Sequence, residues 1–339
     1  MRGKRRFLIG ALCGLLPACA VSHRAGSGAE WRDVSPHRVR FVTVAPGVRL
    51  ETLDWGGAGP PMVFLSGLQD VAHGFDDFAP RFTDRYHVVA ITRRGYGASS
   101  RTASGYDLAT RIADLRSVLD SLGLERVALV GHSMAGDELT AFAGAYPARV
   151  SRLVYLDAAY DHSDIDFGPG FWPPMAAGDS ASPRAVQAYL QRTYGMHIPE
   201  AQLRAIGRYD AAGRLTADVT PAVVDSLMIA GCGHPDYARV RAPALLIYAV
   251  VESARQLTPD WDALDRPHQE LARQFAGRLE AWARLERDRA RRSLAGAEVL
   301  EIPGANHYVF ASHPGQVARA IRAFLSPTRT ALVIPGARP

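Results

Sequence analysis

The sequence predicts an α/β domain with a mostly parallel central sheet that helices cover on both faces. Short apolar runs rich in β-branched residues alternate with longer amphipathic segments along most of the 339 residues, which is typical of a buried parallel sheet. This rhythm stops between residues 158 and 243, where we find no strand-like run. We therefore predict a helical lid at 158–243, inserted into a core formed by residues 36–157 and 244–326.

The individual strands and helices follow from the hydrophobic pattern. Two strands joined by a Pro46-Gly47 turn open the domain, and buried strands follow wherever several apolar residues come in succession. The predicted strands are Val39–Val44, Val48–Leu53, Pro61–Ser66, Tyr86–Thr92, Arg126–Gly131, Arg152–Leu156, Ala244–Val250 and Ala297–Ile302. Amphipathic patterns predict helices at Tyr106–Leu122, Met134–Tyr146, Gln269–Leu294 and Gln316–Leu325.

The predicted lid is rich in aromatic residues. These are Phe167, Phe171, Trp172, Tyr189, Tyr194 and Tyr237. Aromatic side chains on the inner surface of a lid would favour a mainly apolar substrate. A lid must also pack on itself, so we expect about half of them to be structural.

The N-terminus has the order of a targeting segment. Residues 1–6 contain four basic side chains and no acid, a short apolar run follows, and residues 18–20 have the small-x-small form that signal peptidase accepts. We expect a signal peptide at 1–20, a linker at 21–35, and an exported protein that is periplasmic or secreted. Cys19 also lies in a segment similar to a bacterial lipoprotein box, and its lipidation is the only membrane attachment that we expect.

Charge argues against a nucleic-acid partner. The net charge of +5 includes the basic residues of the N-terminus. The arginines between Arg284 and Arg292 interleave with acids, which is typical of a solvated helix face rather than a binding stripe. Residues 327–339 read as a peripheral tail.

The cysteine and histidine spacing predicts neither a disulfide framework nor a metal site. The chain has three cysteines, and cleavage of the N-terminus would remove one or two of them. The histidines of the later chain, such as His162, His197 and His234, are scattered. We therefore expect no metal and no cofactor.

The strongest chemical signal is the segment Gly131–Gly136, with sequence GHSMAG. It follows a predicted strand directly and leads into a predicted helix. A sharp turn at that point lifts a serine hydroxyl out of the sheet, and small neighbours let the backbone pass. Ala135 stands where this pattern usually has its second glycine, a departure that its small size allows. The context predicts Ser133 as a nucleophile.

A second signal lies in the loop after the last predicted strand. The segment Ile302–His307 ends on a histidine at the carboxyl edge of the sheet, just before the closing helix. A serine hydroxyl needs an adjacent base to become a good nucleophile. We therefore predict that His307 is the general base for Ser133.

Residues 39–325 resemble the α/β-hydrolase superfamily, and within it the small lidded esterases and hydrolases. Four blocks carry the resemblance in order: Phe64–Leu68, Arg93–Ser99, Gly131–Gly136 and Pro303–His307. The resemblance implies an α/β-hydrolase fold and an oxyanion hole formed by the backbone N–H groups of Leu68 and Met134. Ser66 stands where many members have histidine, which leaves a backbone oxyanion hole intact.

The acid of the triad stays open between two carboxylates. Members of the superfamily place it after the strand that follows the lid or, less often, after the strand just before the lid. Glu252 follows Ala244–Val250 and occupies the common position, whereas Asp157 ends the strand before the lid. We expect Glu252 to fix the tautomer of His307, with Asp157 as the alternative.

The resemblance implies hydrolysis of an ester or similar acyl bond of a small molecule through an acyl-enzyme, without a cofactor. A serine at position 133 argues against the aspartate-nucleophile chemistry of haloalkane dehalogenases and epoxide hydrolases. The alternatives are carbon–carbon bond hydrolysis or peracid formation on the same triad, and ligand binding without catalysis. The sequence leaves open the substrate, its acyl length and the oligomeric state.

Overall fold

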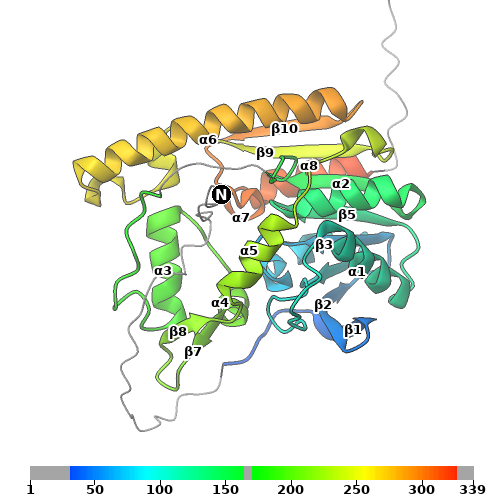
Figure 1. Cartoon of the computed structure of the whole chain (residues 1–339), viewed down its shortest axis with the longest axis horizontal. Coiled ribbons are helices and arrows are strands. Elements are labelled where there is room, and N and C mark those ends of the chain that lie inside the picture. The colour runs from blue at the N-terminus through cyan, green and yellow to red at the C-terminus, as the bar shows by residue number, and fades with distance from the viewer. Residues whose placement is uncertain (1–30, 164–169, 327–339) are drawn as a thin grey trace, which may run out of the picture.

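The centre of the molecule is an eight-stranded sheet with the strand order β1-β2-β4-β3-β5-β6-β9-β10 (Figure 1). A computed structural model describes residues 31–163 and 170–326. The predicted signal peptide, most of the linker, Phe167 and the tail at 327–339 therefore lie outside the described residues. None of the described helices combines the length and the apolar character that a membrane crossing needs.

The strands form at the predicted places, with bounds that differ by at most three residues. They are β1 (Arg38–Ala45), β2 (Val48–Gly56), β3 (Pro61–Leu65), β4 (His87–Ile91), β5 (Val127–His132), β6 (Val150–Leu156), β9 (Ala244–Val250) and β10 (Glu298–Pro303). β1 pairs with β2, and β2 with β4, in antiparallel register, and every later pairing is parallel. The prediction of an α/β-hydrolase fold with a mostly parallel sheet is confirmed.

Alternation along each strand sends apolar side chains to both faces of the sheet. In β3, Val63 and Leu65 join a core with α1, α2 and α6, whereas Met62 and Phe64 join a second core with η1, η2 and α8. These helices are α1 (Leu108–Ser121), α2 (Ala135–Ala145), α6 (Arg266–Ser293), α8 (Pro314–Leu325), η1 (Ala72–Phe75) and η2 (Ala79–Phe82). Burial on both faces explains why the strands read as continuous apolar runs.

Aspartate side chains at the N-termini of α1 and α6 fix where these two helices begin. Asp107 accepts a hydrogen bond from the backbone N–H of Thr110 at the start of α1, and Asp265 does the same for His268 at the start of α6. Short helices η3 (Pro147–Arg149), η4 (Tyr237–Arg239), η5 (Ala254–Leu257), η6 (Trp261–Ala263) and α7 (Val309–Ser312) complete the core.

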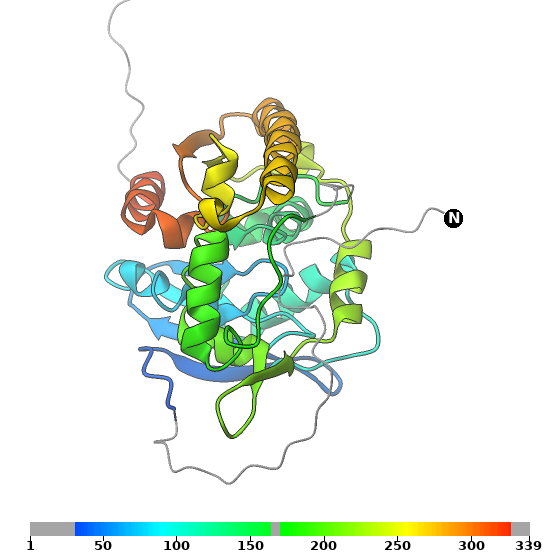
Figure 2. The ribbon, with the colours of Figure 1, turned by 90° about the vertical axis from the view of Figure 1, so that its left-hand side faces the viewer.

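The chain between β6 and β9 forms a separate layer beside the sheet (Figures 1 and 2). It contains α3 (Pro183–Tyr194), α4 (Glu200–Ile206) and α5 (Ala222–Ala230), together with two strands, β7 (Gly207–Tyr209) and β8 (Leu215–Asp218). The prediction that this region has no strands is wrong. The two strands are three and four residues long, too short to give a periodic pattern.

Candidate active site

Ser133 lies at a tight turn between β5 and α2. Its backbone is in the left-handed region, with φ 54°, which is uncommon for a residue with a side chain. Its N–H donates to the carbonyl of Leu156, the last residue of the neighbouring strand, at 3.2 Å. This bond holds the strained turn at the carboxyl edge of the sheet. The geometry is that of the strand-turn-helix element predicted from the sequence.

The small residues around Ser133 are required by close backbone packing. A Cβ on Gly136 would lie 1.7 Å from the carbonyl oxygen of Ala158, so position 136 admits only glycine. Gly67, on the facing loop, would bring a Cβ to 3.2 Å from the Cβ of Ser133. Ala135, by contrast, is fully buried without such a conflict, which explains why it can replace the glycine of the usual pattern.

His307 is paired with Asp157. Its Nδ1 lies 2.7 Å from Oδ2 of Asp157, whose side chain is 8% exposed. His307 follows β10, whereas Asp157 directly follows β6, so the loop after β10 reaches across β9 to make the contact. The partner carboxylate is therefore the one before the inserted segment.

The prediction that Glu252 orients His307 is wrong. After β9 the chain turns outward, and Glu252 is exposed. Its backbone N–H donates to Oε1 of Gln256, whose Nε2 in turn donates to the carbonyls of Val250 and Ala305. The turn after β9 is thus closed by an amide side chain that joins it to the histidine loop, and the carboxylate of Glu252 lies outside this arrangement.

Two further donors hold the Asp157 carboxylate in place. The hydroxyl of Tyr160 donates to Oδ1 at 2.5 Å, and the N–H of Ala249 donates to the same oxygen at 3.0 Å. Burial, followed by the charge of Asp157, raises the pKa of Tyr160 well above its usual value. Tyr160 therefore stays protonated and remains a donor. With Oδ1 occupied in this way, Oδ2 is left for the ring of His307.

The second nitrogen of His307 is available for chemistry. Its Nε2 is buried and has no hydrogen-bond partner among the described residues. His307 and Ser133 both line the same cavity. A buried, unpaired imidazole nitrogen on a wall shared with a serine is suited to accept the serine proton.

The predicted oxyanion donors lie on the same cavity. Leu68 and Met134 both line it, and within the described ranges neither backbone N–H donates to a protein acceptor. The buried guanidinium of Arg93 holds the loop that precedes Leu68. Arg93 donates to the carbonyls of Ser66 and Gly67 and forms an ion pair with Glu138 at 2.6 Å. The Arg93–Ser99 block therefore shapes the loop that carries Leu68.

The buried side chain of His132 contacts the backbone of His307. His132, which is 1% exposed, contacts the carbonyl of His307 through Nε2 at 3.1 Å, and its Nδ1 lies 3.6 Å from Oδ2 of Asp70. Burial lowers the pKa of His132, and the nearby carboxylate of Asp70 only partly offsets it. Tyr308 and Gln202 donate to the other oxygen of Asp70. The ring is therefore expected to be neutral at pH 7.

This lowered pKa predicts an acid-sensitive contribution to stability. Because the folded protein binds the His132 proton less tightly than the unfolded chain, stability is present above the usual pKa of 6.5 and falls as pH drops below it. Between pH 7.5 and 5, the free energy of unfolding should fall more steeply for the wild type than for His132→Gln. The difference in slope has an upper limit of about 1.4 kcal/mol per pH unit. Urea unfolding at several pH values measures it, and parallel curves would contradict a lowered pKa at His132.

The cavity beside Ser133 is mainly apolar and has a volume of about 220 Å³. Among the described residues that line it there is no lysine or arginine. Glu280 is the one glutamate on the wall, and the polar side chains Gln69, His162 and Gln256 interrupt the apolar surface. His162 contacts Asp137 through Nδ1 at 2.8 Å. The site therefore favours an uncharged, largely apolar ligand.

The aromatic residues of the inserted segment divide into two groups. Trp172 and Tyr194 line the cavity, with their ring centroids 5.1 Å apart. Phe171, Tyr189 and Tyr237 are buried in three separate apolar cores. Two of the predicted lid aromatics therefore contribute to the cavity wall, together with Phe275 and Trp282 of α6.

Several residues that shape this site carried no recognisable signal in the sequence. Asp70 acts through contacts with residues far along the chain, Tyr160 reaches Asp157 only through the turn that follows β6, and Glu280 comes from the long helix α6. Arg93 lay in a block noted for its resemblance, but its contact with the loop that carries Leu68 requires the fold. Each of these depends on long-range packing that a local pattern does not encode.

Comparison with known proteins agrees with the fold. The model of the Alpha/beta hydrolase family matches residues 62–320. The chain is 30% identical over 135 residues to an uncharacterized protein of Mycobacterium tuberculosis, a match that spans 40% of this chain and only 39% of that protein. It is 26% identical over 273 residues to the 2-(acetamidomethylene)succinate hydrolase of Mesorhizobium japonicum, covering 79% of this chain and 89% of that enzyme.

Solved structures share the architecture at low sequence identity. The crystal structure of E-2-(acetamidomethylene)succinate hydrolase superimposes with a TM-score of 0.61 at 20% identity, covering 85% of this chain and 98% of that one. The family match includes β3 to α8 and therefore every residue of the candidate site. The chain belongs to the alpha/beta hydrolase family.

Proposed function

We propose that this protein is a serine hydrolase that cleaves an ester or similar acyl bond through a triad of Ser133, His307 and Asp157. The observation that carries the proposal is the 2.7 Å contact between His307 and a buried, firmly held Asp157, on a cavity that Ser133 also lines. This is the arrangement that the triad mechanism requires of its base and acid.

Each residue has a distinct task in the proposed reaction. The Oγ of Ser133 attacks the carbonyl carbon of the substrate while Nε2 of His307 takes the hydroxyl proton. The N–H groups of Leu68 and Met134 stabilise the oxyanion. The proton then passes from His307 to the leaving alcohol. Water attacks the acyl-enzyme with His307 as base, which releases the carboxylic acid and restores Ser133.

The chemistry of the cavity wall supports an uncharged acyl group as the substrate. A carboxylate transferred into an apolar cavity loses its hydration. Only a cation or several hydrogen-bond donors would compensate for that loss. The described wall offers no arginine or lysine, and its one glutamate, Glu280, is paired at 2.6 Å with Arg287, which lies outside the wall. The name of the Mesorhizobium japonicum relative specifies a succinate derivative, which is a dicarboxylate. We therefore propose a different, neutral substrate class for this chain.

We further propose that the inserted segment acts as a lid. Leu190 of α3, Ile206 of α4 and Ile229 of α5 all line the cavity together with residues of the core. An apolar layer over the reacting serine would exclude water from the acyl bond and select for acyl groups that fit the wall.

A pair of esters matched in length tests the substrate class. We expect kcat/KM for p-nitrophenyl pentanoate to exceed that for the p-nitrophenyl monoester of glutarate by about 10-fold or more, because the second ester places a carboxylate in the cavity. Glu280→Gln should narrow this ratio, whereas Glu125→Gln, which changes an exposed acid on the α1–β5 turn, should leave it unchanged. Initial rates over a series of acyl lengths would then define the preferred chain.

Three results would redirect the proposal. Faster cleavage of the glutarate ester would contradict a neutral substrate class while leaving the triad intact. A folded protein that cleaves no aryl ester of any length would favour the carbon–carbon bond hydrolases or perhydrolases. Failure to react with any acylating probe would favour ligand binding without catalysis.

A further inference from the structure

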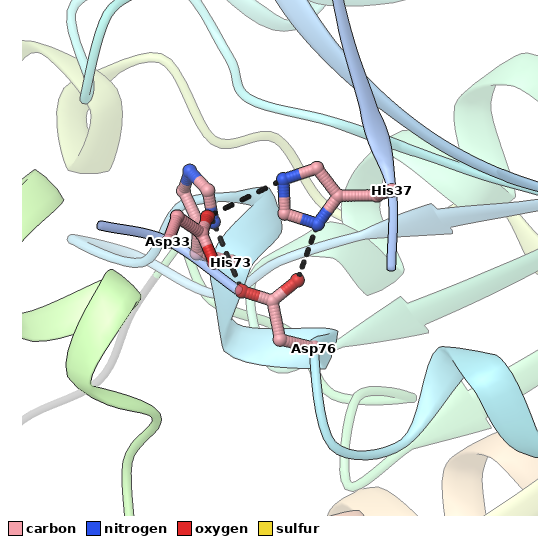
Figure 3. Close-up of side chains that lie close together, drawn as sticks. All are labelled: Asp33, His37, His73 and Asp76. Carbon is pink, nitrogen blue, oxygen red and sulfur yellow. Dashed lines mark hydrogen bonds and ion pairs between the residues drawn. The ribbon is translucent and has the colours of Figure 1, made fainter. Parts of the chain in front are cut away.

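Two aspartates and two histidines, both residue types that bind metal ions, lie together outside the cavity that Ser133 lines. Asp33 and His37 come from the segment that precedes β1, and His73 and Asp76 come from η1 and the residue that ends it (Figure 3). One potential ligand atom from each residue lies within 4.8 Å of every other. None of the four residues lines the cavity of the active site.

The contacts within this cluster form a closed ring of alternating bases and acids (Figure 3). Asp76 lies 2.9 Å from His37 through Oδ1 and 2.9 Å from His73 through Oδ2. Oδ2 of Asp33 lies 3.4 Å from a nitrogen of each histidine. Within the described ranges, neither aspartate pairs with an arginine or a lysine.

Ordinary hydrogen bonds do not account for this ring. Nδ1 of His37 and Oδ1 of Asp76 are buried and 2.9 Å apart, yet neither has a hydrogen bond of acceptable geometry. Their side chains are only 3% and 2% exposed, so bulk solvent has little access to either atom. Unpaired buried groups of this kind are costly. A cation that accepts a lone pair from each would satisfy both.

We propose that Asp33, His37, His73 and Asp76 bind a zinc ion through one imidazole nitrogen or carboxylate oxygen each. Zinc prefers four nitrogen, oxygen or sulfur ligands in a tetrahedron at about 2.0–2.2 Å, which separates neighbouring ligand atoms by roughly 3.4 Å. Because His37 faces Asp33 with Nε2 and Asp76 with Nδ1, only one of its two contacts can belong to the ligand set. The four ligand atoms lie within 4.8 Å of one another, so side-chain rotation would bring them to the spacing that zinc needs.

The choice of zinc follows from the donor set. Calcium and magnesium take oxygen ligands, whereas imidazole suits zinc and the neighbouring transition metals. The two aspartates also supply negative charge that a divalent cation would neutralise.

The position of the site indicates a structural role. The ion would fasten the segment before β1 onto η1, which follows the loop that carries Leu68. The ring of His37 already packs edge-on against Trp55 of β2, with centroids 5.4 Å apart. The spacing of histidines along the sequence gave no sign of this site, because its two halves come from segments that only the fold brings together.

Zinc titration of the untagged protein after chelator treatment tests the proposal. We expect one Zn²⁺ per chain by calorimetry, and a rise in Tm of about 5 °C when free Zn²⁺ is about 100-fold above its Kd. Ca²⁺ at the same concentration should leave Tm unchanged. Ester hydrolysis at low temperature should persist without zinc, because the four ligands lie outside the cavity.

Substitutions of the ligands supply the controls. Asp33→Asn changes the most exposed ligand, whose side chain is 25% exposed, and should weaken Zn²⁺ binding by about 100-fold or more without unfolding the protein. His73→Gln should do the same. His197→Gln, which removes an exposed histidine 3.8 Å from Asp77, should bind zinc as the wild type does. Absence of stoichiometric binding, or unchanged affinity in Asp33→Asn and His73→Gln, would overturn the proposal.

Discussion

Asp157→Asn is expected to lower kcat by about 10⁴-fold in a protein that remains folded. The carboxylate accepts the Nδ1 proton of His307, which leaves Nε2 free to take a proton from Ser133. An asparagine can present its NH₂ group at the position of Oδ2, so the imidazole would carry its proton on Nε2 instead. With its proton on Nε2, the ring cannot accept the proton of Ser133. The asparagine oxygen can still accept from Tyr160 and Ala249, so the local fold should survive.

Glu252→Gln is the matched control for this experiment. It removes the same charge from the carboxylate that the sequence favoured, but this residue is exposed and its side chain lies outside the Asp157–His307 contact. We expect kcat to stay within about twofold of the wild type. Circular dichroism and Tm should be measured for both variants. If Glu252→Gln loses turnover while Asp157→Asn stays active, the acid of the triad is Glu252, after β9, and not Asp157, after β6.

Ser133→Ala is expected to reduce turnover by about 10⁴-fold or more, to the level that binding and the oxyanion donors alone provide. The substitution removes one oxygen atom from a residue that is 6% exposed, so packing should change little. Tm should not fall, because alanine adopts the strained turn no less readily than serine. Measurement of kcat on the preferred ester and of Tm by calorimetry tests both expectations. More than about a tenth of the wild-type rate would contradict the role of Ser133.

Two residues of the proposed triad could be predicted from the sequence, and the third could not. Ser133 and His307 follow strands with local patterns, and their placement on one cavity follows from the parallel sheet. The choice between Asp157 and Glu252 depends on the direction of the chain after β9, which turns outward because Gln256 joins that turn to the histidine loop. This contact links residues nearly fifty positions apart, so no local pattern contains it.

The same limit applies to the two regions that the sequence described least well. The strands β7 and β8 are short and lie between helices, so their side chains give no alternation that could be recognised. The cluster of Asp33, His37, His73 and Asp76 forms because η1 packs against β2, beside the segment that precedes β1, which is a property of topology. In each case the missing information is long-range, whereas the buried strands could be predicted because burial on both faces leaves continuous apolar runs.

The most direct measurement of the central claim is covalent labelling by a fluorophosphonate, followed by intact mass and peptide mapping. A serine activated by His307 on an accessible cavity should react with one equivalent of the probe, and the modified peptide should contain Ser133. Ser133→Ala should remain unlabelled, and Asp157→Asn should react far more slowly. Absence of labelling in the folded wild type, or a label on any other residue, would contradict a serine hydrolase built on Ser133.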